Sequence, residues 1–92
     1  MDINVIFYGI LSEWAGAAEA RLSLQEGSTL GDLLIEIRRL YGSNMPAQLG
    51  KKDQKEFNQS FWVLLGEDHI TEMATRLKDN DELRFLLPLA GG

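Results

Sequence analysis

The sequence contains no cysteine and only one histidine. Without cysteine the chain cannot form disulfide bonds, thiolate metal sites or a catalytic thiol, and its composition suits a reducing compartment. A single histidine cannot build a multi-histidine site, so we expect no metal to be bound. Gly50 and Lys51 do not belong to a nucleotide-binding loop, because Met45 and Lys52 stand where that loop needs glycine and serine or threonine. We therefore expect the chain itself to bind no cofactor.

Basic residues and long apolar runs are also scarce. Nine lysines and arginines stand against 14 aspartates and glutamates, which gives a net charge of −5. Binding of nucleic acid needs a basic face that neutralises phosphates, so we expect no nucleic-acid partner. No apolar run approaches the roughly 18 residues of a membrane span, and the N-terminus lacks the basic and apolar regions of a signal peptide. The expectation is a cytoplasmic protein that does not bind membranes.

The residue pattern predicts a single domain over residues 1–92 with the element order β-β-α-β-β-β. Alternating or β-branched stretches predict five strands, and apolar residues at helical spacing predict one long helix. The strands are expected at 3–8, 18–24, 61–65, 69–70 and 82–88, and the long helix at 30–41. A helical turn is expected within 9–16, and a short helix within 43–59, around either 45–49 or 52–58.

The long helix carries signals at both of its ends. Thr29 followed by Asp32 resembles a capping box, in which each side chain accepts a hydrogen bond from the backbone N–H of the other residue. Arg38 and Arg39 lie near the C-terminal end, where the helix dipole favours cations. Gly42 is predicted to end the helix.

This order predicts an α+β protein with the ubiquitin-like β-grasp fold, in which a mixed sheet of about five strands wraps one main helix. Successive side chains of a strand point to opposite faces, so the sequence also assigns the two faces of the sheet. Phe7, Phe85 and Leu87 are expected to face the helix. Tyr8 and Leu86 are expected to lie on the opposite face.

The sequence offers few side chains that could catalyse a reaction. No nucleophile has a base beside it, and His69, which follows Glu67 and Asp68, is interpreted as an exposed or interface residue. The acidic residues at 79–82 are interpreted as the boundary of a turn. The lysines at 51–55 are interpreted as a solvated loop or as a contact for an acidic partner. We expect the chain to have no catalytic side chains of its own.

The sequence closes on LLPLAGG, residues 86–92. Proline limits strand pairing, so residues 88–92 are expected to form an extended tail that spans about 16 Å at roughly 3.3 Å per residue. Glycine has no Cβ and can pass through a narrow channel into a partner's active site. The carboxylate of Gly92 is a poor electrophile until another protein adenylates it with ATP, after which it can accept an amine or sulfur. A simpler interpretation is a frayed, glycine-rich terminus.

Four segments of the chain resemble the MoaD/ThiS family of sulfur-carrier proteins, and MoaD most closely. They are INVIFYGILSEWAG at 3–16, STLGDLL at 28–34, WVLLGEDHI at 62–70 and LKDNDELRFLLPLAGG at 77–92. Asn80 replaces the glycine that the family usually has in its last turn, and Leu87 replaces the first proline of a pair. The long segment 43–59 favours MoaD, because ThiS-type carriers are shorter there.

The resemblance implies a sulfur carrier for molybdopterin, the organic part of the molybdenum or tungsten cofactor, and a non-catalytic small subunit of molybdopterin synthase. Gly92, preceded by Gly91, would be adenylated by a MoeB/ThiF-type adenylyltransferase that uses ATP, and would then become a thiocarboxylate. A MoaE-like large subunit would receive the inserted tail. The residues that would contact these partners are Tyr8, His69, Leu86, Pro88, Leu89 and Ala90.

Two other functions would use the same adenylate. A ubiquitin-like modifier would join Gly92 to lysines of target proteins. A sulfur carrier of another pathway would deliver its sulfur to thiamine, to cysteine or to a tungsten-specific route. Because the chemistry is identical up to the adenylate, the sequence leaves these alternatives open.

Overall fold

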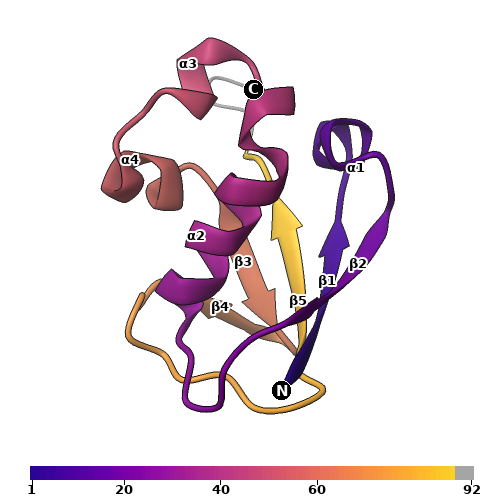
Figure 1. Ribbon diagram of the computed structural model, residues 1–92, viewed down its shortest axis with the longest axis vertical. Helices are drawn as coiled ribbons and strands as arrows, with labels where there is room; N and C mark the ends of the chain where they lie inside the picture. Colours follow the sequence, from indigo (N-terminus) through magenta and orange to yellow (C-terminus); the bar gives the residue numbers. More distant parts are fainter. Residues whose placement is uncertain (89–92) are drawn as a thin grey trace.

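The computed structural model describes residues 1–88, and its centre is a five-stranded sheet with a helix across one face (Figure 1). The strands are β1 (Asp2–Phe7), β2 (Glu19–Ser23), β3 (Trp62–Leu65), β4 (Asp68–Ile70) and β5 (Glu82–Leu86). The helices are α1 (Ile10–Ala15), α2 (Leu30–Tyr41), α3 (Ala47–Gly50) and α4 (Gln54–Gln59), with a 3₁₀ turn, η1, at Gly42–Asn44. This arrangement confirms the predicted α+β, ubiquitin-like β-grasp fold.

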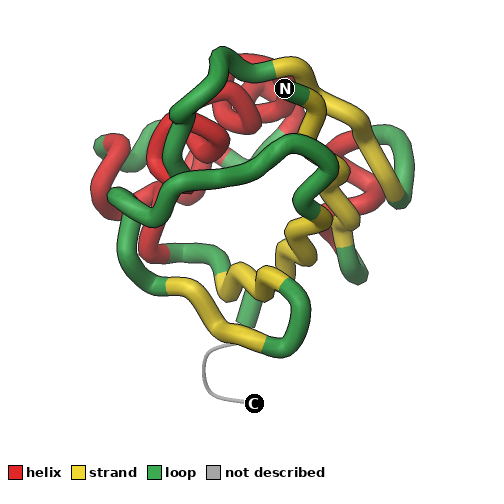
Figure 2. The backbone as a smooth tube through the Cα atoms, turned by 90° about the horizontal axis from the view of Figure 1, so that it is seen from below, coloured by secondary structure: helices red, strands yellow, loops and turns green. Residues whose placement is uncertain are grey.

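Strand β5 lies in the middle of the sheet, although it comes last along the described chain. The strand order is β2-β1-β5-β3-β4, and β5 pairs parallel with β1 and antiparallel with β3. β1 also pairs antiparallel with β2, and β3 with β4, so the sheet is mixed as predicted. Seen from below, the strands form one curved layer (Figure 2). The described chain therefore leaves the sheet from its centre and not from an edge.

The buried core lies between α2 and the sheet. Alternate residues of β1 and β5 are buried, among them Val5 and Phe85, as the alternation predicted. Helix α2 contributes four side chains that are at most 1% exposed: Leu30, Leu33, Leu34 and Ile37. Full burial of a side chain of this kind stabilises the fold by roughly 1.5–3 kcal/mol. Since one apolar stripe of one helix covers one face of the sheet, the other face is left without a helix.

Helix α2 begins and ends where the sequence predicted. Thr29 Oγ1 accepts from the Asp32 N–H at 3.2 Å and Asp32 Oδ2 accepts from the Thr29 N–H at 2.9 Å, which confirms the capping box. The predicted stop at Gly42 is confirmed, since α2 ends at Tyr41 and Gly42 is its C-cap residue, but Gly42 does not take the left-handed conformation common at a helix end. Gly42 keeps helical angles, with φ −59° and ψ −35°, and its carbonyl accepts from the Met45 N–H, so the chain continues into η1. Glycine permits a left-handed turn but does not require one, and here the hydrogen bonds of η1 decide.

Both short helices that the sequence offered as alternatives form in the segment between α2 and β3. Helix α3 buries Leu49, and helix α4 buries Phe57, so each short helix is fixed to the core by one apolar side chain. Asp53 caps α4 by accepting a hydrogen bond from the Glu56 N–H at 2.8 Å. No helix within residues 1–88 combines the length and the apolar character that crossing a bilayer requires.

Arg38 ties this segment to α2. Its guanidinium donates hydrogen bonds to the carbonyl oxygens of Gly50, at 3.1 Å, and Lys52, and to Gln54 Oε1 at 3.4 Å. The same group lies 5.2 Å from the centre of the Phe57 ring, within the range of a cation–π contact. Several donors in one planar group therefore satisfy backbone carbonyls that have no strand or helix partner of their own.

The turn between residues 78 and 81 is built as the sequence predicted, and its acidic residues are structural. Asn80 has a φ of +68°, which asparagine tolerates, and its Oδ1 accepts from Arg21 at 2.7 Å. Asp79 Oδ1 accepts from the Asp2 N–H at 2.7 Å, and Asp81 Oδ2 accepts from the Lys78 N–H at 2.8 Å. These bonds fix the entry into β5 beside the start of β1.

Replacement of Arg38 by Met should lower the free energy of unfolding by about 2 kcal/mol, because half-buried carbonyls lose a charged donor. Urea unfolding followed by circular dichroism measures this change. Arg39→Met is the matched control, since Arg39 is exposed and bonds only its helical neighbour Glu36 among the described residues. The midpoint of the control should stay close to that of the parent, and equal losses in the two variants would contradict the role given to Arg38.

Candidate docking surface

Backbone pairing and core packing hold the described chain up to Leu87. The Tyr8 N–H donates to the Phe85 carbonyl at 3.1 Å, which extends the pairing of β1 with β5 beyond Phe7. Leu87 is half-buried and packs against the core, on the side that the alternation predicted. Pro88 is exposed and is the last residue that the structure describes. The other predicted tail residues, Leu89, Ala90, Gly91 and Gly92, lie outside the described residues.

The three predicted partner-contact residues in the body of the fold lie on the sheet face away from α2. Tyr8 follows β1 and is 42% exposed, Leu86 ends β5, and His69 lies in β4. Tyr8 and Leu86 line one hollow of about 270 Å³, so the structure brings these two together at the end of the sheet where the chain leaves it. His69 lies in β4, two strands away from β5. A residue of the intervening strand β3 lies between His69 and Leu86.

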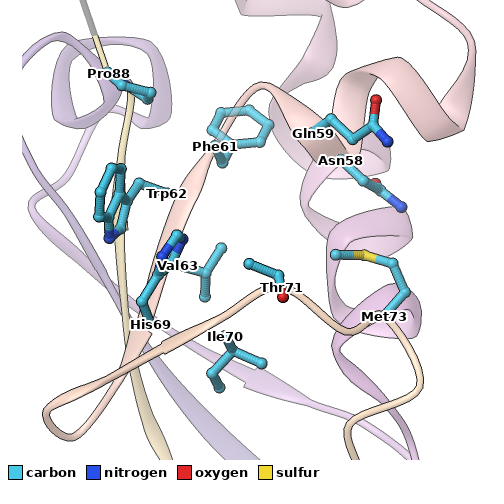
Figure 3. Close-up of a pocket in the computed structure, with 10 residues that line it drawn as sticks. All are labelled: Asn58, Gln59, Phe61, Trp62, Val63, His69, Ile70, Thr71, Met73 and Pro88. Carbon is cyan, nitrogen blue, oxygen red and sulfur yellow. The ribbon is translucent and has the colours of Figure 1, made fainter.

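That residue is Trp62, which sequence reasoning missed. Trp62 pairs with Leu86 across β3 and β5, and its side chain is 45% exposed. Its ring stacks on that of His69, with the centroids 4.1 Å apart and the planes at 15° (Figure 3). The signal was present in the sequence, because Trp62 alternates with the buried Phe61 and Val63 and so must point to the open face. We call Tyr8, Trp62, His69 and Leu86 the docking face.

A shallow hollow of about 240 Å³ connects the Trp62–His69 stack with the end of the chain. Pro88 lines it at one end, and Asn58 and Met73 line the opposite wall (Figure 3). Large aromatic rings that stay this exposed on a small protein are typical of a surface that binds another protein. The docking face therefore reaches Pro88, the last described residue.

Charged groups lie around the docking face. Glu67 lies in the turn before β4, Asp68 begins β4 beside His69, and Arg84 lies 4.0 Å from Glu82 on β5. Within residues 1–88 no group of three or more acidic or histidine residues is placed to hold a metal ion. The chemistry available on this face is apolar contact and stacking, with acidic residues at its rim.

The shifted pKa values of the described residues belong to a different part of the surface. On α2 the hydrogen bond from Arg39 lowers the pKa of Glu36, and the same bond raises the pKa of Arg39. Both groups are on the helix that covers the opposite face of the sheet. The pair therefore plays no part in the docking face.

Fold and site together define a small β-grasp protein of the ubiquitin-like class, whose central strand leads the chain out beside an apolar face. A model of the ThiS family matches residues 5–92, so the chain belongs to the ThiS family. This confirms the resemblance to MoaD and ThiS proteins that the sequence motifs indicated. None of the curated proteins matches the chain.

Solved structures of similar proteins cover almost the whole chain. SAMP1 from Haloferax volcanii superposes with a TM-score of 0.80 at 21% identity, over 100% of both chains. The small archaeal modifier protein 1 from Methanosarcina acetivorans has a TM-score of 0.74 at 27% identity, covering 99% of this chain and 96% of its own. A chain in the complex of subunits 1 and 2 of the molybdopterin-converting factor from Helicobacter pylori has a TM-score of 0.55 at 25% identity, over 100% of both chains.

Replacement of Trp62 by Ala should lower the free energy of unfolding by only about 1 kcal/mol, the value of an exposed aromatic stack. Phe85→Ala should lower it by about 3–5 kcal/mol, because Phe85 precedes Leu86, the partner of Trp62 on β5, and is buried in the core. Thermal and urea unfolding of the two variants measure the difference. Equal losses would mean that Trp62 is retained for stability and not for docking.

Proposed function

We propose that this protein carries sulfur on its C-terminal carboxyl group for the synthesis of molybdopterin. The observation that carries the proposal is the family match, which runs through the closing glycines to residue 92. The structure supports it in two ways. The last strand is the central one, and the docking face adjoins the residue from which the tail departs.

The proposed reaction uses the Gly92 carboxyl group of this chain and the active site of another protein. A carboxylate oxygen of Gly92 attacks the α-phosphorus of ATP in the activating enzyme, and pyrophosphate leaves. Hydrosulfide or an equivalent donor then attacks the acyl carbon, a C–S bond forms, and AMP leaves with the bonding electron pair. The product is a thiocarboxylate, and no oxidation or reduction accompanies these two steps when the donor is hydrosulfide. The chain itself supplies the carboxyl group and binds no cofactor.

The partners would be a MoeB/ThiF-type adenylyltransferase that loads the tail and a MoaE-like large subunit that unloads it. Both would bind the docking face, so that Tyr8, Trp62 and Leu86 anchor the body while residues 88–92 enter the active site. The Helicobacter pylori structure, a complex of subunits 1 and 2 of the molybdopterin-converting factor, supports a partner of the second kind. An apolar face with a rigid aromatic anchor suits sequential binding of two different proteins.

A second candidate is a ubiquitin-like modifier that is joined through Gly92 to lysines of other proteins. The likeness to the small archaeal modifier protein 1 of Methanosarcina acetivorans, at 27% identity, favours it. The adenylate is the same, and only the acceptor differs, an amine in place of sulfur. Delivery of the sulfur to thiamine or cysteine remains a variant of the first proposal.

Incubation of the native protein with a cognate adenylyltransferase, ATP and hydrosulfide should replace one oxygen of Gly92 by sulfur. Intact-protein mass spectrometry detects the product, and fragmentation places it on the last residue. Deletion of Gly92 should abolish the product and leave the unfolding midpoint unchanged, because the residues of the core are untouched. Lysine isopeptides to Gly92 in cell extracts, without thiocarboxylate, would favour the modifier instead.

Trp62→Ala should weaken binding to the adenylyltransferase about tenfold, as expected for an anchoring aromatic residue at the centre of an interface. Calorimetric titration of the unloaded protein measures the dissociation constant. Ile35→Ala is the matched control, since Ile35 is an apolar side chain of α2 that is 51% exposed on the opposite side of the molecule. Similar weakening by both changes would exclude the docking face as the site of binding.

A further inference from the structure

One row of side chains crosses the open face of the sheet from one edge strand to the other. Each residue of the row is the register partner of the next, in the order Glu19, Ile6, Arg84, Leu64 and His69. Side chains that are directly opposite in neighbouring strands lie about 5 Å apart, so each contacts or nearly contacts the next. Arg84 therefore stands at the middle of the open face, on the central strand β5.

The surroundings of Arg84 on this face are mostly apolar. Ile6 and Leu64, its partners on the two flanking strands, are half-buried. Leu86, two positions along β5, belongs to the docking face, and Glu82, two positions the other way, is the one charged neighbour among these four described residues. An arginine in such a place can cover apolar groups with its carbon stem and keep its guanidinium at the surface. The docking face thus continues into an apolar area that has a positive charge at its centre.

Glu82 leaves most of this guanidinium without a partner. The Arg84 Nε and Glu82 Oε1 atoms are 4.0 Å apart, both side chains are nearly half exposed, and an exposed pair of this length contributes little. Arg21 is engaged more fully, because it donates to Asn80 Oδ1 at 2.7 Å and lies 3.6 Å from Asp2. A guanidinium has five N–H donors in a planar fork that binds a carboxylate through two parallel hydrogen bonds. Arg84 is therefore available to a carboxylate of another protein.

We propose that Arg84 is a specificity-determining residue beside the docking face and pairs with a carboxylate of the adenylyltransferase that loads this chain. The identity of this partner rests on the proposed function, and its chemistry rests on the row. A surface with apolar side chains around one aspartate or glutamate complements Arg84, Ile6 and Leu64 in both charge and polarity. A surface with a basic side chain at that point is rejected, because like charges that lose their water are strongly unfavourable.

Binding of the adenylyltransferase to variants at this position tests the proposal. Arg84→Gln should raise the dissociation constant about tenfold or more, since an arginine that loses its water at the centre of an interface is a frequent energetic hot spot. Arg84→Glu should raise it by about 100-fold or more, because two carboxylates would then face each other. Isothermal titration calorimetry measures these constants. Unchanged thermal midpoints show that the fold is intact.

Arg76→Gln and Arg76→Glu are the matched controls, because they change the net charge by the same amounts. Arg76 is an exposed arginine outside the five strands, beside Thr29 at the start of α2. The control variants should stay within about twofold of the parent dissociation constant, since a distant exposed charge is screened by salt. An equal effect of the changes at Arg76 and Arg84 would mean that only the overall charge matters, and it overturns the proposal.

Arg84→Lys identifies the partner group directly. A water-soluble carbodiimide joins the introduced amine to a carboxylate in contact with it, and the carbodiimide takes up the released water as a urea. Peptide mapping by mass spectrometry should place the new amide on an aspartate or glutamate of the adenylyltransferase. Arg76→Lys, treated in the same way, should give no such link.

Two further results overturn the proposal. The first is a dissociation constant for Arg84→Gln equal to that of the parent. The second is a crosslink that joins position 84 only to Glu82 or to a second copy of this chain. A parent protein that does not bind the adenylyltransferase overturns the proposed function as well. A parent that binds and forms the thiocarboxylate, while Arg84→Gln binds equally well, overturns only the role of Arg84.

Discussion

The pairing of β5 between β1 and β3 is the constraint on which the rest of this molecule depends. Hydrogen-bonded ladders hold the last described strand on both sides, and the Tyr8 N–H extends one ladder to Phe85. The centre of a sheet is among the parts of a domain that open least often. Pro88 therefore follows a strand that is paired on both sides. A strand at the sheet edge would fray.

The same sheet explains why one of its faces is left open. One helix is enough to bury one face, and the small size of the chain provides no second layer for the other. On that open face Trp62 is held rigid by its stack on His69, and the hollow beside the stack ends at Pro88. The exposed aromatic stack and the last described residue thus line the same hollow. This geometry is consistent with the proposed carrier, in which partners would bind this face.

Most of the fold was predictable because its signals are local. The period of two in the strands, the helical period of 30–41 and the capping box at Thr29 each depend on residues a few positions apart. The helix stop at Gly42 was also predictable, but the 3₁₀ turn η1 that follows it was not, because its hydrogen bond joins Gly42 to Met45 beyond the helix. The hydrogen bonds of Arg38 to the segment before β3 could not be predicted, for a related reason. Its carbonyl acceptors at Gly50 and Lys52 come together only after the segment has folded back on α2.

For the candidate site, the sequence by itself determined which side chains point away from the helix, because alternation along a strand is a property of the backbone. The alternation placed Tyr8 and Leu86 on the correct face of the sheet. The same alternation also assigns Trp62 to that face. Only the tertiary structure decided that Trp62 meets His69, that β5 lies at the centre, and that the hollow beside this stack reaches Pro88. Strand order and register join residues far apart in the chain, and their choice depends on how the whole apolar surface is buried rather than on any short stretch of sequence.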